Sequence, residues 1–171
     1  DDGMNGFELW KTNGTPGNAV LVKDINPLIG DSSPSGFTVF NNALYFSADR
    51  AAGAELWKSD GTTGATVRVG AVSLVSGLTV FNNALYFSAS DGVAGIELWK
   101  TDVAGSTVQV KGINNTTLGA PNALTVLNNA LLFSADDGMT GRELWRTDGS
   151  GTMRVKDICP GSCDGLPVLV P

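Results

Sequence analysis

The chain has 171 residues, which is enough to bury a sizeable core as one domain or to form a substantial part of a larger one. Its 11 Lys and Arg residues against 17 Asp and Glu residues give a formal net charge of −6, and no basic cluster could follow a phosphate backbone, so we expect no nucleic-acid partner. Histidine is absent, which excludes Ser-His-Asp and Cys-His nucleophile systems and every His-based metal site, and argues against an enzyme. No apolar run approaches the roughly 20 residues that span a bilayer, so we expect no membrane insertion.

Two short strings recur along the chain and define a repeat of about 46 residues. The string Glu-Leu-Trp occurs four times, at intervals of 47, 42 and 46 residues. Its copies begin at Glu8, Glu55, Glu97 and Glu143. The string Asn-Asn-Ala-Leu occurs three times, and its copies begin at Asn41, Asn82 and Asn128.

In chain order, the sequence predicts strands at residues 7–11 and 20–25 and then three sets of four short strands. The sets are 36–40, 43–48, a strand around Trp57 and 66–72; 77–81, 84–89, a strand around Trp99 and 107–113; and 123–127, 130–135, a strand around Trp145 and 152–158. An Asn-Asn pair separates the first two strands of each set. Asparagine tolerates the positive φ that both positions of a type I′ turn require, so these pairs predict two-residue hairpins.

Four short antiparallel strands in about 46 residues are typical of one blade of a β-propeller. The first two strands of each set are apolar on both faces, as suits a sheet covered on each side by the next blade, whereas a sandwich would alternate more cleanly. A β-solenoid is the main alternative, but its coils are usually shorter and lack paired hairpins. No stretch shows a helical period. We therefore predict an all-β fold, a β-propeller of four-stranded antiparallel blades.

We expect one propeller domain, or a fragment of one, over residues 1–171. The repeat units are approximately 1–35, 36–76, 77–122 and 123–164, with 165–171 starting a further blade. Only the second strand of a fourth blade is missing. The chain is therefore either a ring of about four blades, closed by a three-stranded blade, or a segment of a larger propeller, which we favour.

The blocks 136–149, which read DDGMTGRELWRTDG, and 1–14 resemble the ELWxxDGT repeats of large exported bacterial proteins. The resemblance spans essentially the whole chain. It implies a bacterial protein that is secreted or displayed on the cell surface, and it implies no particular activity. Some copies depart from the pattern, since Asn13 replaces the turn Asp, Val103 replaces the turn Gly, and Arg50 with two alanines stands where other copies carry Asp-Gly.

The four tryptophans are candidate ligand-binding residues. An indole face can stack on a sugar ring while its N–H binds a polar group. A tryptophan at the same strand position of every blade is more often a filler between sheets, and we favour packing. The candidates are Trp10, Trp57, Trp99 and Trp145.

Alternation along a strand places the glutamate of each Glu-Leu-Trp string on the same face as its tryptophan. A carboxylate in an otherwise apolar strand must be solvated or paired. The fourth strands offer Lys23, Lys111 and Lys156 at matching positions, with Gly70 in the remaining repeat. We expect a structural role for the glutamates, through an ion pair or main-chain hydrogen bonds, rather than a catalytic carboxylate pair.

Acidic residues gather in the loops between the second and third strands, each just before glycine. Clustered carboxylate oxygens on a loop are ligands that Ca²⁺ prefers, which makes calcium the one candidate cofactor. The spacing of an EF-hand is absent and Asp-Gly is common in turns, so we favour turn formation. The candidate ligands are Asp1, Asp2, Asp91, Asp136 and Asp137.

Two cysteines, Cys159 and Cys163, are separated by three residues in a turn-rich stretch. A short-loop disulfide is geometrically feasible there, and it would indicate an oxidising compartment. The alternative is a pair of reduced, buried thiols.

Three functions remain open. The first, which we favour, is a non-catalytic extracellular or cell-surface module that presents loops to a glycan, a surface protein or further copies of itself. The second is a passive spacer in a large adhesin. The third is a propeller glycosidase with two carboxylates in one cleft. Such an enzyme usually carries one unusual blade, and the repeat intervals show no insertion of that kind.

Overall fold

The computed structural model describes residues 2–27, 30–50, 53–114 and 119–161. All regular structure in these ranges is β-strand, in fourteen strands labelled β1 to β14. Nowhere in the same ranges does a helix occur that is long and apolar enough to cross a membrane. The predicted all-β class is confirmed.

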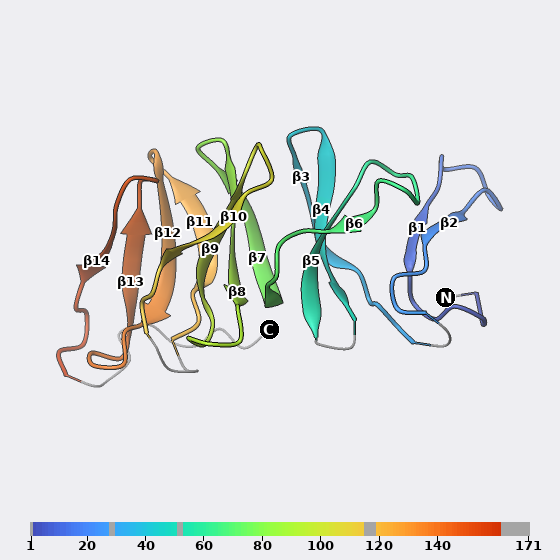
Figure 1. The fold of residues 1–171 in the computed structure, drawn as a ribbon. Helices are drawn as coiled ribbons and strands as arrows, with labels where there is room; N and C mark the ends of the chain where they lie inside the picture. The colour runs from blue at the N-terminus through green and yellow to red at the C-terminus, as the bar shows by residue number, and fades with distance from the viewer. Residues whose placement is uncertain (1, 28–29, 51–52, 115–118, 162–171) are drawn as a thin grey trace. The chain divides into compact units, whose positions relative to one another are not determined.

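The strands form one two-stranded sheet and three four-stranded sheets, and within each sheet the strands are hydrogen-bonded in sequence order (Figure 1). The two-stranded sheet consists of β1 (Leu9–Lys11) and β2 (Val20–Lys23). The next sheet consists of β3 (Ser35–Phe40), β4 (Ala43–Asp49), β5 (Ala54–Ser59) and β6 (Val67–Arg68). The third consists of β7 (Ser73–Phe81), β8 (Ala84–Ser90), β9 (Glu97–Asp102) and β10 (Thr107–Lys111). The fourth consists of β11 (Asn122–Leu127), β12 (Ala130–Asp136), β13 (Arg142–Thr147) and β14 (Thr152–Lys156).

These four-stranded antiparallel meanders are the blades predicted from the repeat. The chain divides into two compact units, Asp1–Val75 and Ser76–Pro171. The first unit contains the β1–β2 and β3–β6 sheets. The second contains the β11–β14 sheet and the β7–β10 sheet apart from the start of β7. The residues predicted to start a further blade, 165–171, lie outside the described residues.

The Asn-Asn turns have the predicted conformation. Asn41 and Asn42 have φ angles of 47° and 57°, and the pairs after β7 and β11 repeat these angles to within a degree. Positive φ at both central residues is the signature of a type I′ turn, whose twist matches that of the strands it joins. The turn fixes the register, so Phe40 pairs with Ala43 directly across the hairpin.

The first strand of a blade also carries a bulge. The pairing register shifts between Ser35 and Thr38 and between Asn122 and Thr125. Gly36 has a φ of 65° and Ala123, at the equivalent position, a φ of 54°. An extra residue in the left-handed region is the usual way in which such a bulge bends a strand.

Each unit buries one layer of side chains between its two sheets. In the first unit, the layer consists of Leu9, Val22, Ile25, Phe46, Ala48 and Trp57, with Leu44 at its edge. In the second unit, it consists of Phe81, Ala84, Tyr86, Leu98, Ile113, Leu131, Phe133, Ala135 and Trp145, with Val110 and Leu124 at its edge. The tryptophan of one sheet thus packs against the preceding sheet, as in neighbouring propeller blades.

Candidate functional site

The glutamates of the Glu-Leu-Trp strings are buried and accept hydrogen bonds from main-chain N–H groups. Glu97, which is 1% exposed, accepts from the N–H of Ile113 at 2.7 Å and from that of Asn114 at 3.1 Å. Burial raises the pKa of Glu97, and these two N–H groups oppose the rise. The carboxylate thereby joins β9 to the segment that leaves β10.

The same arrangement recurs at two other glutamates. Glu8 accepts from the N–H of Ile25 at 2.7 Å and from the hydroxyl of Ser32 at 2.6 Å. Glu143 accepts from the N–H of Ile158 at 2.8 Å. In each case, the carboxylate fixes the main chain where it leaves the last strand of the sheet.

Glu55 differs, because its Oε1 lies 3.2 Å from Nε of Arg68 in an ion pair. Of the two kinds of partner expected for the other glutamates, main-chain N–H groups are present, and the lysines form no ion pair with them in the described structure. A register shift in the fourth strand places Lys111 opposite Leu98 rather than opposite Glu97. Main-chain N–H groups occupy the place where those lysines were expected.

The tryptophans lie in or beside the two cores. Trp57 and Trp145 are 3% and 7% exposed, and Nε1 of Trp145 donates to the carbonyl of Ala135 at 3.1 Å. Trp10 and Trp99 are half-buried. The indole N–H groups of Trp10, Trp57 and Trp99 are enclosed without an acceptor among the described residues. These N–H groups are therefore not presented to a ligand.

Trp10 borders a hollow. With Phe7, Pro34 and Phe37, it lines a depression of about 420 Å³ in the first unit. Phe7 and Phe37 are 57% and 54% exposed. Stacking of a sugar ring on Trp10 stays a prediction that these contacts do not test.

The carboxylates of the acidic loops accept hydrogen bonds from main-chain N–H groups of the same loops. Asp2 accepts from the N–H groups of Met4 and Asn5 at 3.0 and 2.9 Å. Asp91 accepts from the N–H of Val93 at 2.9 Å in the same way. Asp136 accepts from the N–H of Gly138 at 2.7 Å. These are the side-chain bonds by which aspartate stabilises turns.

Asp137 forms the most elaborate of these turns. It accepts from the N–H groups of Met139 and Thr140 at 3.0 and 2.9 Å and from the Thr140 hydroxyl at 2.9 Å. Burial acts to raise its pKa, but these hydrogen bonds and the nearby Arg154 outweigh burial, so the pKa lies below its usual value. In the described part of the chain, no three acidic or thiol side chains gather as metal ligands. Asp1 lies outside that part, as does Cys163, the predicted disulfide partner of Cys159.

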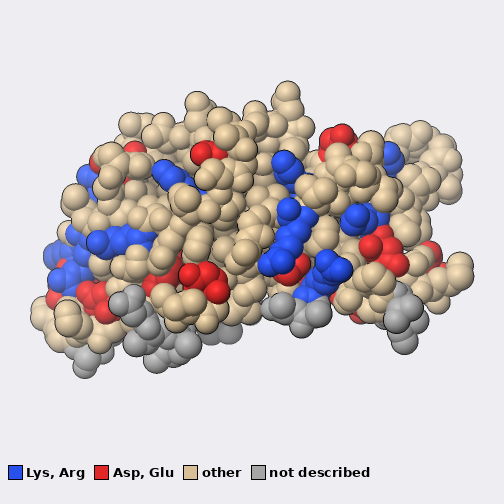
Figure 2. Space-filling view, in the orientation of Figure 1, with Lys and Arg blue, Asp and Glu red and all other residues tan. Residues whose placement is uncertain are grey.

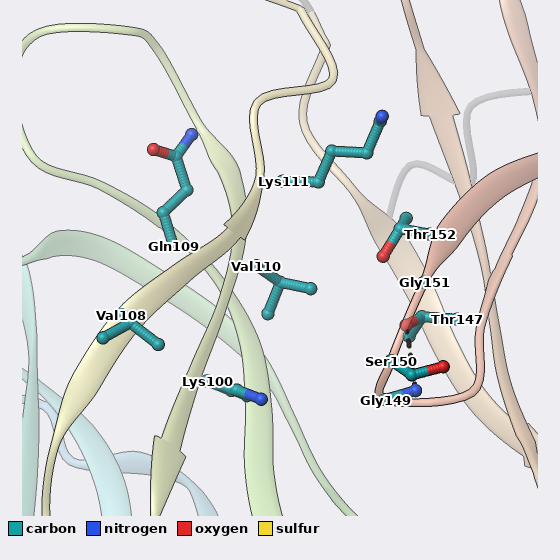
Figure 3. Close-up of a pocket in the computed structure, with 10 residues that line it drawn as sticks. All are labelled: Lys100, Val108, Gln109, Val110, Lys111, Thr147, Gly149, Ser150, Gly151 and Thr152. Atoms are coloured by element: carbon teal, nitrogen blue, oxygen red, sulfur yellow. Dashed lines mark hydrogen bonds between the residues drawn. The ribbon is translucent and has the colours of Figure 1, made fainter.

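A second hollow, of about 430 Å³, lies in the second unit between two neighbouring sheets (Figure 3). One wall comprises Lys100 of β9 and the β10 residues Val108, Gln109, Val110 and Lys111. The other comprises Thr147 and the residues of the β13–β14 turn and its exit, Gly149, Ser150, Gly151 and Thr152. Figure 3 shows Lys100 and Val110 pointing toward this turn, whereas Lys111 extends away from Gly149 and Ser150, at the other end of the hollow.

The two lysines of this hollow have no hydrogen-bond or ion-pair partner among the described residues. Asp148, next to the hollow, directs its carboxylate into its own turn. It accepts from the N–H groups of Ser150 and Gly151 at 2.9 and 3.0 Å and from the Ser150 hydroxyl at 2.7 Å. The Ser150 hydroxyl, with these N–H groups, lowers the pKa of Asp148 to about 2. Elsewhere on the face shown in Figure 2, basic and acidic side chains are interspersed.

In the first unit, two hydrogen bonds join the equivalent sheet and turn. There Nζ of Lys11 donates to the carbonyl of Gly61 at 2.8 Å, and the Thr63 hydroxyl donates to the carbonyl of Val22 at 2.6 Å. Both bonds run from one sheet to the turn of the next. The Lys11 bond uses the ammonium group that corresponds to that of Lys100.

The length of the turn explains the difference. Trp57 pairs with Arg68, whereas Trp145 pairs with Arg154, so the β13–β14 connection is two residues shorter than the β5–β6 connection. The shorter connection has no counterpart of Thr63. In the sequence, the sign of this hollow is a shortened turn opposite two lysines. The recurring Glu-Leu-Trp and Asn-Asn-Ala-Leu strings do not reveal it.

Comparison with known proteins supports the fold and nothing finer. No family model matches the chain, and no curated protein matches it. Among solved structures, it is similar to the crystal structure of a puromycin hydrolase S511A mutant complexed with PGG, with 16% sequence identity and a TM-score of 0.54. The match covers 71% of this chain and 20% of that chain, so the chain spans about a fifth of the hydrolase's length. At this identity, the likeness concerns the fold alone.

Proposed function

We propose that this chain is a non-catalytic binding module of an exported or cell-surface protein, with a glycan or a surface protein as its partner. The observation that carries the proposal is the burial of the motif glutamates. A glycosidase needs one carboxylate to donate a proton and another to attack or activate water. Here the acidic groups common to all repeats are engaged with main-chain N–H groups or with Arg68, so they serve the fold.

The open hollow of the second unit favours binding over a purely passive spacer. A spacer needs only stable blades, and in the first unit the hydrogen bonds of Lys11 and Thr63 between neighbouring sheets meet that need. The second unit leaves two lysines without a partner in the same position. An ammonium group that no protein group binds is available to a ligand.

The extracellular location rests on the resemblance to ELWxxDGT repeats and on the predicted bond between Cys159 and Cys163. Alkylation of the purified protein with and without prior reduction, followed by mass spectrometry, tests the bond. Fractionation of the source cells tests the location. Two freely alkylated thiols together with a cytosolic location would contradict this part of the proposal.

The binding function is tested by applying the purified chain to an array of neutral and acidic glycans and to extracts of surface proteins. We expect saturable binding to one class, with the ligand recovered unchanged. Release of product from a glycoside or a peptide, abolished by Glu97→Gln in a protein that still folds, would make the chain an enzyme. Absence of any partner would leave the spacer as the function.

A further inference from the structure

We propose that the hollow between β9–β10 and the β13–β14 turn binds the carboxylate-bearing sugar of an acidic polysaccharide. This inference rests on the proposed binding function and names the ligand class and the residues. Lys100 and Lys111, whose ammonium groups lie at opposite ends of the hollow in Figure 3, would each pair with a carboxylate of the polymer, and Val108 and Val110 would contact a sugar ring.

Charge is the first argument. The chain carries a net charge of −6, yet two ammonium groups line this one hollow without a partner among the described residues. The nearest acidic group in the turn, Asp148, is occupied by three hydrogen bonds and lies 3.8 Å from a guanidinium nitrogen of Arg146. An anion entering the hollow therefore meets two uncompensated positive charges, which attract it from a distance.

Shape and polarity are the second argument. The volume of about 430 Å³ lies within the range of small-molecule sites. Val108 is 44% exposed and Val110 half-buried, so β10 offers an apolar strip beside the lysines. The hydroxyl of Thr152 faces them from the opposite wall. A uronic acid combines the matching groups, namely a carboxylate, ring hydroxyls and an apolar face of C–H groups.

The turn itself argues against a phosphate ligand. Phosphate sites commonly use successive main-chain N–H groups that point at the anion. In this turn, the N–H groups of Ser150 and Gly151 are both engaged by Asp148. The hollow thus offers lysine point charges but not the cradle of N–H groups that is common in phosphate sites.

The test is isothermal titration of the whole chain with an oligogalacturonate of defined length and with a neutral galactan oligosaccharide of equal length. Binding of the acidic oligomer alone is expected, and it should weaken as salt is added. Lys100→Gln and Lys111→Gln should each lower the affinity about tenfold or more, since each removes a charge-assisted hydrogen bond. The matched control is Lys156→Gln, which makes the same charge change at the position of β14 that corresponds to Lys111, outside the hollow, and should leave the affinity unchanged.

A fourth variant blocks the hollow without changing its charge. Gly151 is not among the residues with positive φ, and a Cβ placed there meets no atom within 4 Å, so Gly151→Leu is compatible with the turn. The added side chain should fill the space and abolish binding while both lysines remain. If that variant unfolds, the lysine variants alone decide.

The possible results of these titrations distinguish a failure of this binding site from a failure of the proposed binding function. Unchanged affinity in both lysine variants, or binding only to the neutral oligomer or to a glutamate-rich peptide, would overturn the inference and leave the binding function standing. No binding to any glycan or protein partner would overturn both. A selective loss in the lysine and Gly151 variants, with Lys156→Gln unaffected, establishes the site.

Discussion

The Oε2 atom of Glu97 accepts a 2.7 Å hydrogen bond from the N–H of Ile113, and both residues are buried. Glu97→Ala leaves this N–H and that of Asn114 without the carboxylate, and an unpaired buried donor costs about 1–3 kcal/mol. We expect the free energy of unfolding to fall by about 3 kcal/mol, measured by urea denaturation. Glu97→Gln retains one acceptor and should cost less. Equal stability of the alanine variant and the wild type would show that the bond contributes nothing.

Replacing tryptophan by phenylalanine should cost more at Trp145 than at Trp57. Both side chains are buried, but Trp145 donates its N–H to Ala135 at 3.1 Å while the N–H of Trp57 has no acceptor among the described residues. The two changes remove similar apolar area. Trp145→Phe additionally loses a hydrogen bond, so its unfolding free energy should fall by about 1 kcal/mol more. Thermal and urea unfolding of the two variants provide the comparison, and the reverse order would contradict the assigned role of the indole N–H.

Ala123→Gly should stabilise the protein, although glycine usually weakens a strand. Ala123 has a φ of 54° at the bulge of β11, where Gly36 and Gly77 stand in the other blades. A left-handed conformation costs a non-glycine residue roughly 1–2 kcal/mol, which exceeds the entropy cost of glycine of about 0.5–1 kcal/mol. We expect a small rise in melting temperature.

The matched change, Gly77→Ala, should lower the melting temperature. A Cβ at Gly77 meets only Leu124 Cδ1, at 3.6 Å, so space is available and the strain comes from the φ of 68°. A destabilising Ala123→Gly together with a neutral Gly77→Ala would show that the bulge does not require this conformation.

The ionisation of Asp148 should make a measurable contribution to acid stability. Its pKa is lowered from the ordinary 3.8 to about 2, first by the Ser150 hydroxyl and then by main-chain N–H groups. The folded state therefore binds the proton more weakly than the unfolded state, and the contribution is present above pH 3.8 and lost as the pH falls toward about 2. Asp148→Asn should lack this component. Carboxyl NMR titration measures the midpoint directly, and a midpoint at the ordinary value would contradict the turn geometry.

The hairpins could be predicted from the sequence because their cause is local. Asn41 and Asn42 specify the turn, the turn specifies the register, and alternation then assigns the faces of β3 and β4. The fourth strands were less predictable. Residues 66–72 yield only β6, Val67–Arg68, because Gly70 leaves the extended conformation with a φ of 68°.

Of the two partners considered for the glutamates, a lysine and main-chain N–H groups, the lysine is absent for a related reason. Counting along the sequence places Lys111 beside Glu97, but the register shift between Gln109 and Lys111 turns the lysine away. Main-chain N–H groups then satisfy the carboxylate. A bulge changes which residues face each other across the two strands beyond it. Val110 and its neighbours are not of a residue type that predicts a bulge.

The hollow of the second unit could not be derived from the motif, because it depends on how far one turn reaches toward the preceding sheet. Lys11 and Lys100 occupy the same position in their repeats. Only the longer turn that contains Gly61 and Thr63 reaches across. The lengths of the two turns, and not the residues that recur in every repeat, distinguish the second unit from the first at this position.

The span of the glutamate hydrogen bonds bears on how the chain folds. Glu8, Glu97 and Glu143 each bind an N–H only 15 to 17 residues further on. The strands between them pair with their sequence neighbours. During synthesis, the strands and the glutamate acceptor of one blade are thus all present once about one repeat has been made. Short loop closures of this kind favour rapid folding of the blade even in an all-β topology. Each blade could acquire its pairing before the next has emerged, which limits the time for which unpaired strand edges are exposed to aggregation.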